Sequence, residues 1–347
     1  MSASVTTIAT DIARSRASRG RRRTLIIAVL TILIVIAALI SLMVGHTWYS
    51  PADVVRVILG EHVAGASFTV GELRLPRAVL AVAVGFSFGL AGVTFQTMLR
   101  NPLASPDIIG ITAGAGAAAS FAIIVLSLSA AQVSVVAITA GLLIALLVYL
   151  LSFRRGVIGT RLILIGIGVG AMLDAFTAYV LSRAGEWDLQ QAMRWLSGSL
   201  NGVTWSNAVT VLIALCVLAP VLLSQSRNLA TMRLGDDTAA ALGVRVERTR
   251  VILIVAAVGL IAFGTAAAGP IAFVAFLSGP IAARIVGPHG SLLVPAGLVG
   301  ALLVVVADFF GQWLLGTRFP VGVVTGVLGA PYLIYLIVRI NRVGGSL

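Results

Sequence analysis

Residues 72–116 read ELRLPRAVLAVAVGFSFGLAGVTFQTMLRNPLASPDIIGITAGAG, an uncharged apolar run between charged ends. The 22 residues from Ala78 to Leu99 are enough to cross about 30 Å of hydrocarbon as an α-helix. Four residues in this run are not needed by a helix that faces only lipid: Gly85, Gly89, Gly92 and Gln96. Small residues let helices approach closely, and a polar side chain at membrane depth needs a partner or a watery cavity. The run therefore predicts a transmembrane helix inside a bundle, with Gln96 as an intramembrane polar site.

The composition is that of a polytopic membrane protein. Apolar residues make up 59% of the 347 residues and charged residues 10%, against about 25% charged residues in soluble domains. All 24 basic residues are arginine, and a Walker A phosphate loop requires a lysine, so the chain is not a P-loop ATPase. One cysteine and three scattered histidines give no cluster with metal-ligand spacing. We therefore expect no catalytic residue, no metal site and no cofactor.

The apolar pattern predicts an all-α fold with about ten membrane-spanning helices. The expected spans are 24–45, 78–99, 107–127, 131–152, 161–182, 206–225, 250–267, 271–288, 292–313 and 321–338. A further short helix near 190–200 is too polar to span the membrane. Residues 1–23 are expected to form a basic cytoplasmic tail, and residues 24–340 a single transmembrane domain.

The arginines indicate the orientation of these spans. Ten crossings that start inside place both termini in the cytoplasm, with 18 of the 24 arginines inside and the other 6 outside. Arginine gathers in cytoplasmic loops, so this orientation is favoured over its inverse. The net charge of +12 then reflects topology and does not indicate a nucleic-acid partner. The basic tail is expected to be attracted to anionic lipid of the bilayer.

Five segments carry motifs in the order typical of one transporter family. They are LRLPR, AGxxxQ and RNPLAxPxxxG within 73–110, WLSGSL at 195–200, LGDDTAAALGV at 234–244, GPIAFV at 269–274 and PVGVVTGVLGAP at 320–331. Over about residues 50–340 the chain resembles the FecCD-type permeases, the membrane subunits of ABC importers for iron-siderophore complexes, haem and cobalamin. The resemblance implies a type II ABC importer permease architecture in the bacterial plasma (inner) membrane. It also implies three protein partners: an ABC ATPase, an extracellular or periplasmic substrate-binding protein, and a second permease subunit, identical or similar.

Arginines at the predicted outer surface are candidates for docking of the binding protein. Arg74 and Arg77 flank Pro76 at the mouth of the second span, where they could pair with lipid phosphates or with carboxylates of a partner. The resemblance implies that both dock the substrate-binding protein. The family often has a third outer arginine after an Ala-Asp pair, but residues 311–312 are Gly-Gln here. We expect Arg318 to supply that third positive charge.

The proline-rich segment 101–106 ends the second span on the inner side. Its two prolines block a regular helix, and the residues alone are compatible with a tight turn. The resemblance implies an inner gate here, with Asn101 and Leu103 at the translocation path, and a second gate position at Gly159 and Thr160. Gly159 departs from the hydroxyl residue that is usual in the family, so this second gate is expected to be looser or placed differently.

Residues 227–249 form the longest polar stretch inside the chain. Two aspartates begin a Thr-Ala-Ala-Ala-Leu run there and a glycine follows it, which predicts a short capped helix. The residues alone allow this helix to be a linker. The resemblance implies a coupling helix that docks on the ATPase. The residues expected to form it are Leu234, Gly235, Asp236, Ala239, Ala240, Leu242 and Gly243.

Two aspartates lie within predicted spans, where ionisable residues are functional candidates by default. Asp308 is close to the outer surface, which favours a structural, hydrogen-bonded role. Asp174 lies about 20 Å along its helix from Arg161, and its role stays open. Gly166 and Gly170 on the same helix are spaced for close packing against a neighbouring helix.

The expected cargo is a metal that is already chelated, because the chain has no ligand cluster able to bind a free ion. Gly279-Pro280 stands where cobalamin-type members often have Pro-His, and 322–332 is most similar to catecholate-siderophore permeases. A ferric siderophore is therefore favoured, with cobalamin or haem as alternatives. An ion-coupled secondary transporter is an alternative from another class, and only Asp174 supports it.

Overall fold

Helices account for all regular secondary structure in the described parts of this computed structural model, which are residues 2–152, 159–287, 290–314 and 316–344. Within these described ranges, seven helices are long and apolar enough to cross a membrane. They are α1 (Ser2–Met43), α3 (Leu75–Met98), α5 (Ala130–Ser152), α6 (Gly159–Ser182), α8 (Trp205–Ser224), α11 (Val246–Ala268) and α13 (Leu293–Trp313). Three further helices have shorter apolar segments: α4 (Ile111–Ile124), α12 (Val274–Val286) and α14 (Val321–Gly344), in which the apolar part is Val321–Leu336. These ten correspond to the ten spans that the sequence predicts.

Two of these helices begin later than predicted, because the chain turns sharply just before each of them. The third predicted span was expected from 107, but residues Pro106–Ile109 form a 3₁₀ turn, η2, and Gly110 has φ +76°. α4 therefore begins at Ile111. Similarly, α12 begins at Val274 and not at 271, because Phe273 is left-handed with φ +64°. A residue with positive φ cannot continue a right-handed helix.

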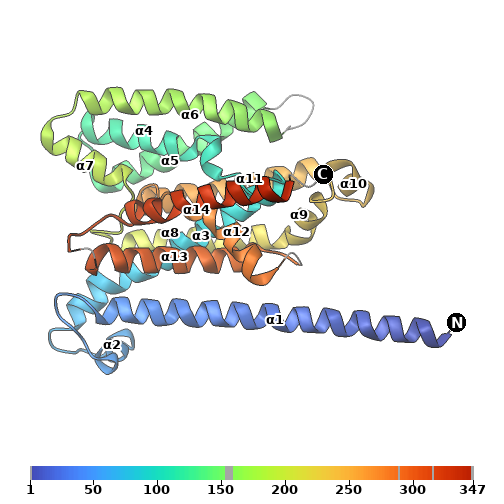
Figure 1. The fold of residues 1–347 in the computed structure, drawn as a ribbon. Helices are drawn as coiled ribbons and strands as arrows, with labels where there is room; N and C mark the ends of the chain where they lie inside the picture. Colours follow the sequence, from blue (N-terminus) through green and yellow to red (C-terminus); the bar gives the residue numbers. More distant parts are fainter. Residues whose placement is uncertain (1, 153–158, 288–289, 315, 345–347) are drawn as a thin grey trace.

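The basic N-terminal segment is an extension of the first membrane helix. α1 runs without interruption from Ser2, so residues 2–23 continue the helix that then crosses the membrane. Figure 1 shows α1 projecting beyond the bundle, with the start of α1 and the end of α14 at the same end of the molecule. The Nη2 atom of Arg22 donates to the carbonyl oxygen of Ile285 at 3.3 Å, which holds α1 against the last turn of α12.

The remaining helices lie at the two ends of the bundle (Figure 1). At one end are α2 (Pro51–Ile58), the π-helical segment η1 (Thr69–Arg74) and α7 (Glu186–Leu196). The side chain of Ser50 caps α2 by accepting from the backbone N–H of Asp53 at 3.2 Å, a pattern typical of helix starts. At the other end are α9 (Ser226–Met232) and α10 (Asp236–Ala241). The predicted orientation makes the α2 and α7 end the outer one.

α3 is the central helix, and it packs most extensively on α13. A Cβ atom added at Gly85 or Gly89 would overlap backbone atoms of α13, and one at Gly92 would overlap the backbone of Ala275 in α12. The three glycines therefore bring α3 into direct backbone contact with two neighbours. Gln96 is buried and donates through Nε2 to the carbonyl oxygen of Phe276 at 2.9 Å. The prediction of a helix packed inside the bundle is confirmed.

Candidate functional site

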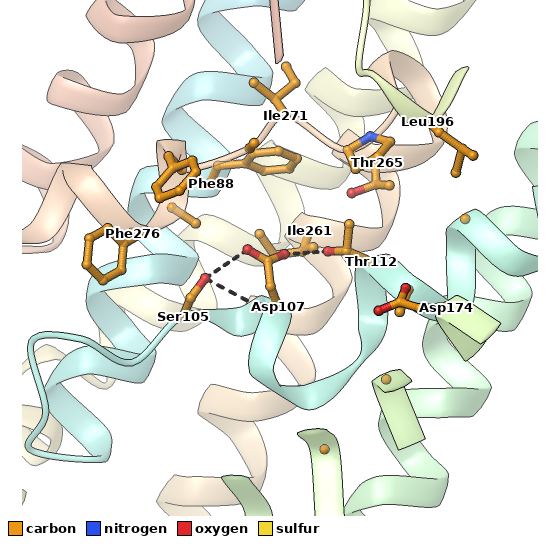
Figure 2. A pocket seen from close by; sticks show the side chains of 18 of the residues that line it. Phe88, Ser105, Asp107, Thr112, Asp174, Leu196, Ile261, Thr265, Ile271 and Phe276 are labelled. Carbon is orange, nitrogen blue, oxygen red and sulfur yellow. Dashed lines mark hydrogen bonds between the residues drawn. The ribbon is translucent and has the colours of Figure 1, made fainter. Parts of the chain in front are cut away.

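A cavity of about 710 Å³ lies between α4, α6, α11 and the segment 270–276 that leads into α12. Figure 2 shows its wall from Ser105 and Asp107, beside the proline-rich segment, to Leu196 at the end of α7. On α6 the lining residues extend from Gly166 to Thr177, which is about 16 Å of helix. The cavity therefore extends lengthwise between the two ends of the bundle.

The polar groups of this cavity are carboxylates and hydroxyls. Asp107 accepts hydrogen bonds from the hydroxyls of Ser105, at 2.9 Å, and of Thr112 (Figure 2). Asp174 has neither a hydrogen bond nor an ion pair within the described parts of the chain. The hydroxyl of Thr265 is buried and has no hydrogen-bond partner among the described residues. No arginine or histidine is among the described residues that line the cavity.

Sequence reasoning missed Asp107. A signal for it is present in the chain, because Ser105-Pro106-Asp107 is the pattern of a capped turn. Ser105 accepts from the backbone N–H of Asp107 at 3.4 Å and donates to its carboxylate, so the turn fixes the carboxylate at the cavity wall. Without the structure, this aspartate is not distinguishable from an ordinary turn residue.

The glycines of α6 allow close contact with a neighbouring helix and also leave space for the cavity. A Cβ atom added at Gly110, at the start of α4, would lie 3.6 Å from the carbonyl oxygen of Gly166 and 3.7 Å from the amide nitrogen of Gly170. The two helices therefore meet closely there. A Cβ added at Gly170 itself meets nothing within 4 Å, and this residue lines the cavity. Close packing, which the spacing predicted, is therefore only part of the reason for glycine at 170.

The arginines expected at the outer surface have different partners. Arg74 donates to the carbonyl oxygens of Leu42, Met43 and Thr47 at 2.8, 3.1 and 2.8 Å. It therefore supplies hydrogen bonds to carbonyl groups at the C-terminal end of α1, which have no partner within the helix. Arg77 donates through Nε and Nη2 to the two carboxylate oxygens of Asp308, both at 2.7 Å. The two residues are therefore engaged inside the chain and do not form a free pair of cations.

Arg318 lies close to the same region. Its guanidinium contacts the ring nitrogen of His46 and lies 5.8 Å from the ring centre of Trp313. His46 lies between Met43 and Thr47, whose carbonyl oxygens accept hydrogen bonds from Arg74. The structure thus gathers the predicted docking residues at one end of the bundle, and Arg318 is exposed and has no carboxylate partner among the described residues.

The segment expected to form the inner gate is a tight irregular turn. Asn101 accepts through Oδ1 from the backbone N–H of Leu103 at 2.9 Å. Asn101 also lines a second cavity of about 320 Å³ with Gln96 and Arg233, while Leu103 is half-buried and lines neither cavity. Gly159 and Thr160 stand at the start of α6, and their side chains lie outside the described part of the structure.

The predicted capped helix is present as α10. It begins at Asp236, and Gly243, with φ +87°, ends it. The backbone N–H groups of Gly243 and Val244 donate to the carbonyl oxygens of Ala240 and Ala239 at 2.9 and 3.0 Å. This pair of hydrogen bonds is the pattern of a Schellman cap. Leu234 and Leu242, on either side of the helix, are 64% and 63% exposed.

Two residues of this segment make their contacts within the chain. Ala239, for which a packing contact with the ATPase is the prediction, is fully buried in the chain's own core. Asp236 begins the helix as predicted. Its carboxylate pairs with Arg250 at 2.6 Å and Arg100 at 3.6 Å, from α11 and the end of α3. Among the predicted residues, Leu234, Ala240, Leu242 and Gly243 are exposed.

Known proteins resemble this chain over nearly its whole length. The model of the FecCD transport family matches residues 32–339. The ferric enterobactin transport system permease protein FepG of Escherichia coli is 39% identical over 312 residues, which cover 89% of this chain and 94% of FepG. The iron(3+)-hydroxamate import system permease protein FhuG of Bacillus subtilis is 36% identical, with 91% and 97% covered. A solved inward-facing metal-chelate type ABC transporter matches with a TM-score of 0.81 and 29% identity, covering 90% of this chain and 99% of that one.

Proposed function

The chain belongs to the FecCD transport family, and we propose that it is the permease subunit of an ABC importer that carries ferric siderophore complexes across the bacterial plasma membrane. The observation that supports this most is the long cavity inside a membrane-spanning bundle, placed between an arginine-bearing end and an end with an exposed capped helix. ATP hydrolysis is assigned to a separate chain, because a Walker A loop needs a lysine and this chain has none.

The cavity between α4 and α6 is assigned to the translocation path, and the turn at 101–106 to its inner gate. Ser105, at the end of this turn, also lines the cavity, so a movement of the turn reaches the cavity wall directly. Asn101 and Leu103 lie within the same turn, and Gly159 and Thr160 at the start of α6 are assigned to the second gate position.

The ATPase is proposed to dock on the surface formed by Leu234, Ala240 and Leu242. Two large apolar side chains that are almost two-thirds exposed, at the end of the bundle where no lipid is expected, indicate a protein partner. Gly235 and Gly243, both with positive φ, fix the two ends of α10 and so the direction in which it presents this surface.

The substrate-binding protein is proposed to dock at the opposite end, where Arg318 offers an exposed guanidinium to an acidic partner. Arg74 and Arg77 contribute positive potential there while they remain bonded within the chain. A second permease subunit is proposed to pack on the apolar faces of α6 and α14, where Met172 and Val327 are 74% and 69% exposed. Lipid covers the remaining apolar surface.

The test is uptake by a bacterial strain that lacks this chain. We expect the strain to lose accumulation of radioactive iron supplied as a ferric siderophore, to keep uptake of cobalamin and haem, and to recover when the gene is returned. A catecholate and a hydroxamate complex are supplied separately, so that the siderophore class is resolved in the same experiment. Loss of cobalamin or haem uptake with intact ferric siderophore uptake overturns the proposal.

A further inference from the structure

The carboxylate of Asp236 pairs with two arginines of the chain itself, although Asp236 begins the helix proposed to meet the ATPase. Its Oδ2 accepts from Nη2 of Arg250 at 2.6 Å, and its Oδ1 lies 3.6 Å from Nη2 of Arg100. Arg250 belongs to α11, whereas Arg100 directly precedes the proline-rich turn 101–106. One carboxylate therefore connects the proposed docking helix, a central membrane helix and the proposed inner gate.

Arg250 is the tightly held partner. Its side chain is 8% exposed, and it also donates to Glu247 at 2.7 Å. A buried guanidinium that loses its only carboxylate is strongly destabilising, but Arg250 keeps Glu247 when Asp236 moves away. Because Glu247 still pairs with Arg250, the loss of the Asp236–Arg250 contact leaves no unpaired buried charge. This contact can therefore break and form again.

Arg100 is the loosely held partner. Its side chain is 49% exposed, its distance to Asp236 is the longer of the two, and it lies against the start of α10 beside Gly235. Its backbone has φ +52°, a conformation that is uncommon for a residue other than glycine and that the turn imposes on it. A change in the turn therefore moves Arg100, and a movement of Arg100 acts on the turn.

We propose that Asp236 couples α10 to the gate turn by sharing its carboxylate between Arg250 and Arg100. This rests on the proposed function, in which the ATPase moves α10. In the structure Asp236 contacts both arginines, each through a different carboxylate oxygen. When α10 is displaced, the contact with Arg100 tightens or breaks, and Arg100 and the gate turn that follows it are thereby held or released. An element that alternates between two such arrangements is what switching requires.

The test uses the purified permease, ATPase and binding protein reconstituted in vesicles, with ATP hydrolysis and ferric siderophore uptake measured together. The variants are Asp236→Asn, Arg100→Gln and the two combined. Asp237→Asn is the matched control, because Asp237 is the neighbouring aspartate, is exposed and has no ion pair within the described parts. The reported quantity is ATP hydrolysed per complex transported.

We expect each single variant to raise this ratio about fivefold, the lower range of measured coupling between sites. The double variant is expected to equal the larger single effect, because both changes remove one interaction. Asp237→Asn is expected to match the wild type. Effects that multiply in the double variant, or an unchanged ratio in Arg100→Gln, overturn the proposal. A wild-type complex without ATP-dependent uptake contradicts the proposed function itself, and so the two failures are distinguishable.

Discussion

Arg77 of α3 and Asp308 of α13 form a two-point ion pair, with nitrogen–oxygen distances of 2.7 Å at both contacts. The side chain of Asp308 is 5% exposed and that of Arg77 19%, so the pair is largely withdrawn from water. Arg77 also donates to Asn201 at 2.7 Å, which ties the segment after α7 to the same point. An arginine proposed to attract the binding protein therefore also joins the two helices that form the centre of the bundle.

Removing the carboxylate from this pair is expected to destabilise the protein. Asp308→Asn leaves the half-buried guanidinium of Arg77 without its counter-charge, and breaking a pair that is largely withdrawn from water costs about 3 kcal/mol. Thermal unfolding of the detergent-solubilised protein measures the loss. The variant with both Arg77→Met and Asp308→Leu is expected to recover part of it, and no recovery would show that the pair is not the cause.

Arg318 gives a cleaner test of docking, because it has no carboxylate partner within the described parts. Arg318→Glu is expected to weaken binding of the substrate-binding protein about tenfold at low salt, since it replaces an attraction by a repulsion. The difference is expected to shrink as salt rises. Binding is measured on immobilised complex. The control is Arg56→Glu, a reversal at an outer arginine that Glu61 already pairs at 2.6 Å; an equal effect in this control contradicts a specific site.

Much of the fold could be predicted because spans and caps depend on local sequence. The length of the apolar runs predicted the ten apolar helices, and the Asp-Asp start and Gly243 predicted α10 with its cap. The late start of α4 was not predicted, because the turn at Pro106 and Gly110 contains an apolar Ile-Ile pair that reads as helix. The hydrophobic pattern does not show that Gly110 is left-handed, and this conformation separates the turn from the helix.

The site residues were harder to predict, because their partners are distant in the sequence. Arg77 and Asp308 are separated by 231 positions, and nothing in the sequence indicates that they meet. Asp236 was predicted at the start of the short helix, but its pairing with Arg250 and Arg100 was not predicted. Motif position therefore predicted which segments to consider and did not predict which way individual charges face.

The cavity predicts a size limit at Gly170. Gly170→Ala adds one methyl group to open space and replaces a poor helix former, so uptake is expected to persist with stability raised by up to about 1 kcal/mol. Gly170→Trp fills the space between α6 and α4 and is expected to reduce uptake at least about tenfold. Vesicle uptake and complex assembly are measured for both variants. Full uptake by assembled Gly170→Trp would place the path elsewhere.

Asp174 separates the importer from an ion-coupled transporter. This carboxylate lines the cavity and makes no hydrogen bond or ion pair within the described parts. The other carboxylate of the cavity wall, Asp107, accepts from Ser105 and Thr112 and not from a further titratable group, whereas a proton relay requires a connected chain of such groups. Asp174→Asn is therefore expected to keep ATP-driven uptake within about twofold of the wild type. Uptake is also expected to continue when a protonophore collapses the proton gradient at constant ATP. Loss of uptake in both experiments would favour the ion-coupled alternative.

The most direct measurement of the central claim is ATP hydrolysis by the reconstituted complex of this chain and its ATPase, with and without binding protein loaded with ferric siderophore. The account predicts that the loaded binding protein stimulates hydrolysis, because it binds one state of the transport cycle more tightly than the other. It also predicts that Arg318→Glu loses most of this stimulation while the complex stays assembled. A chain that assembles with no ATPase and still moves ferric siderophore down an ion gradient would contradict the account.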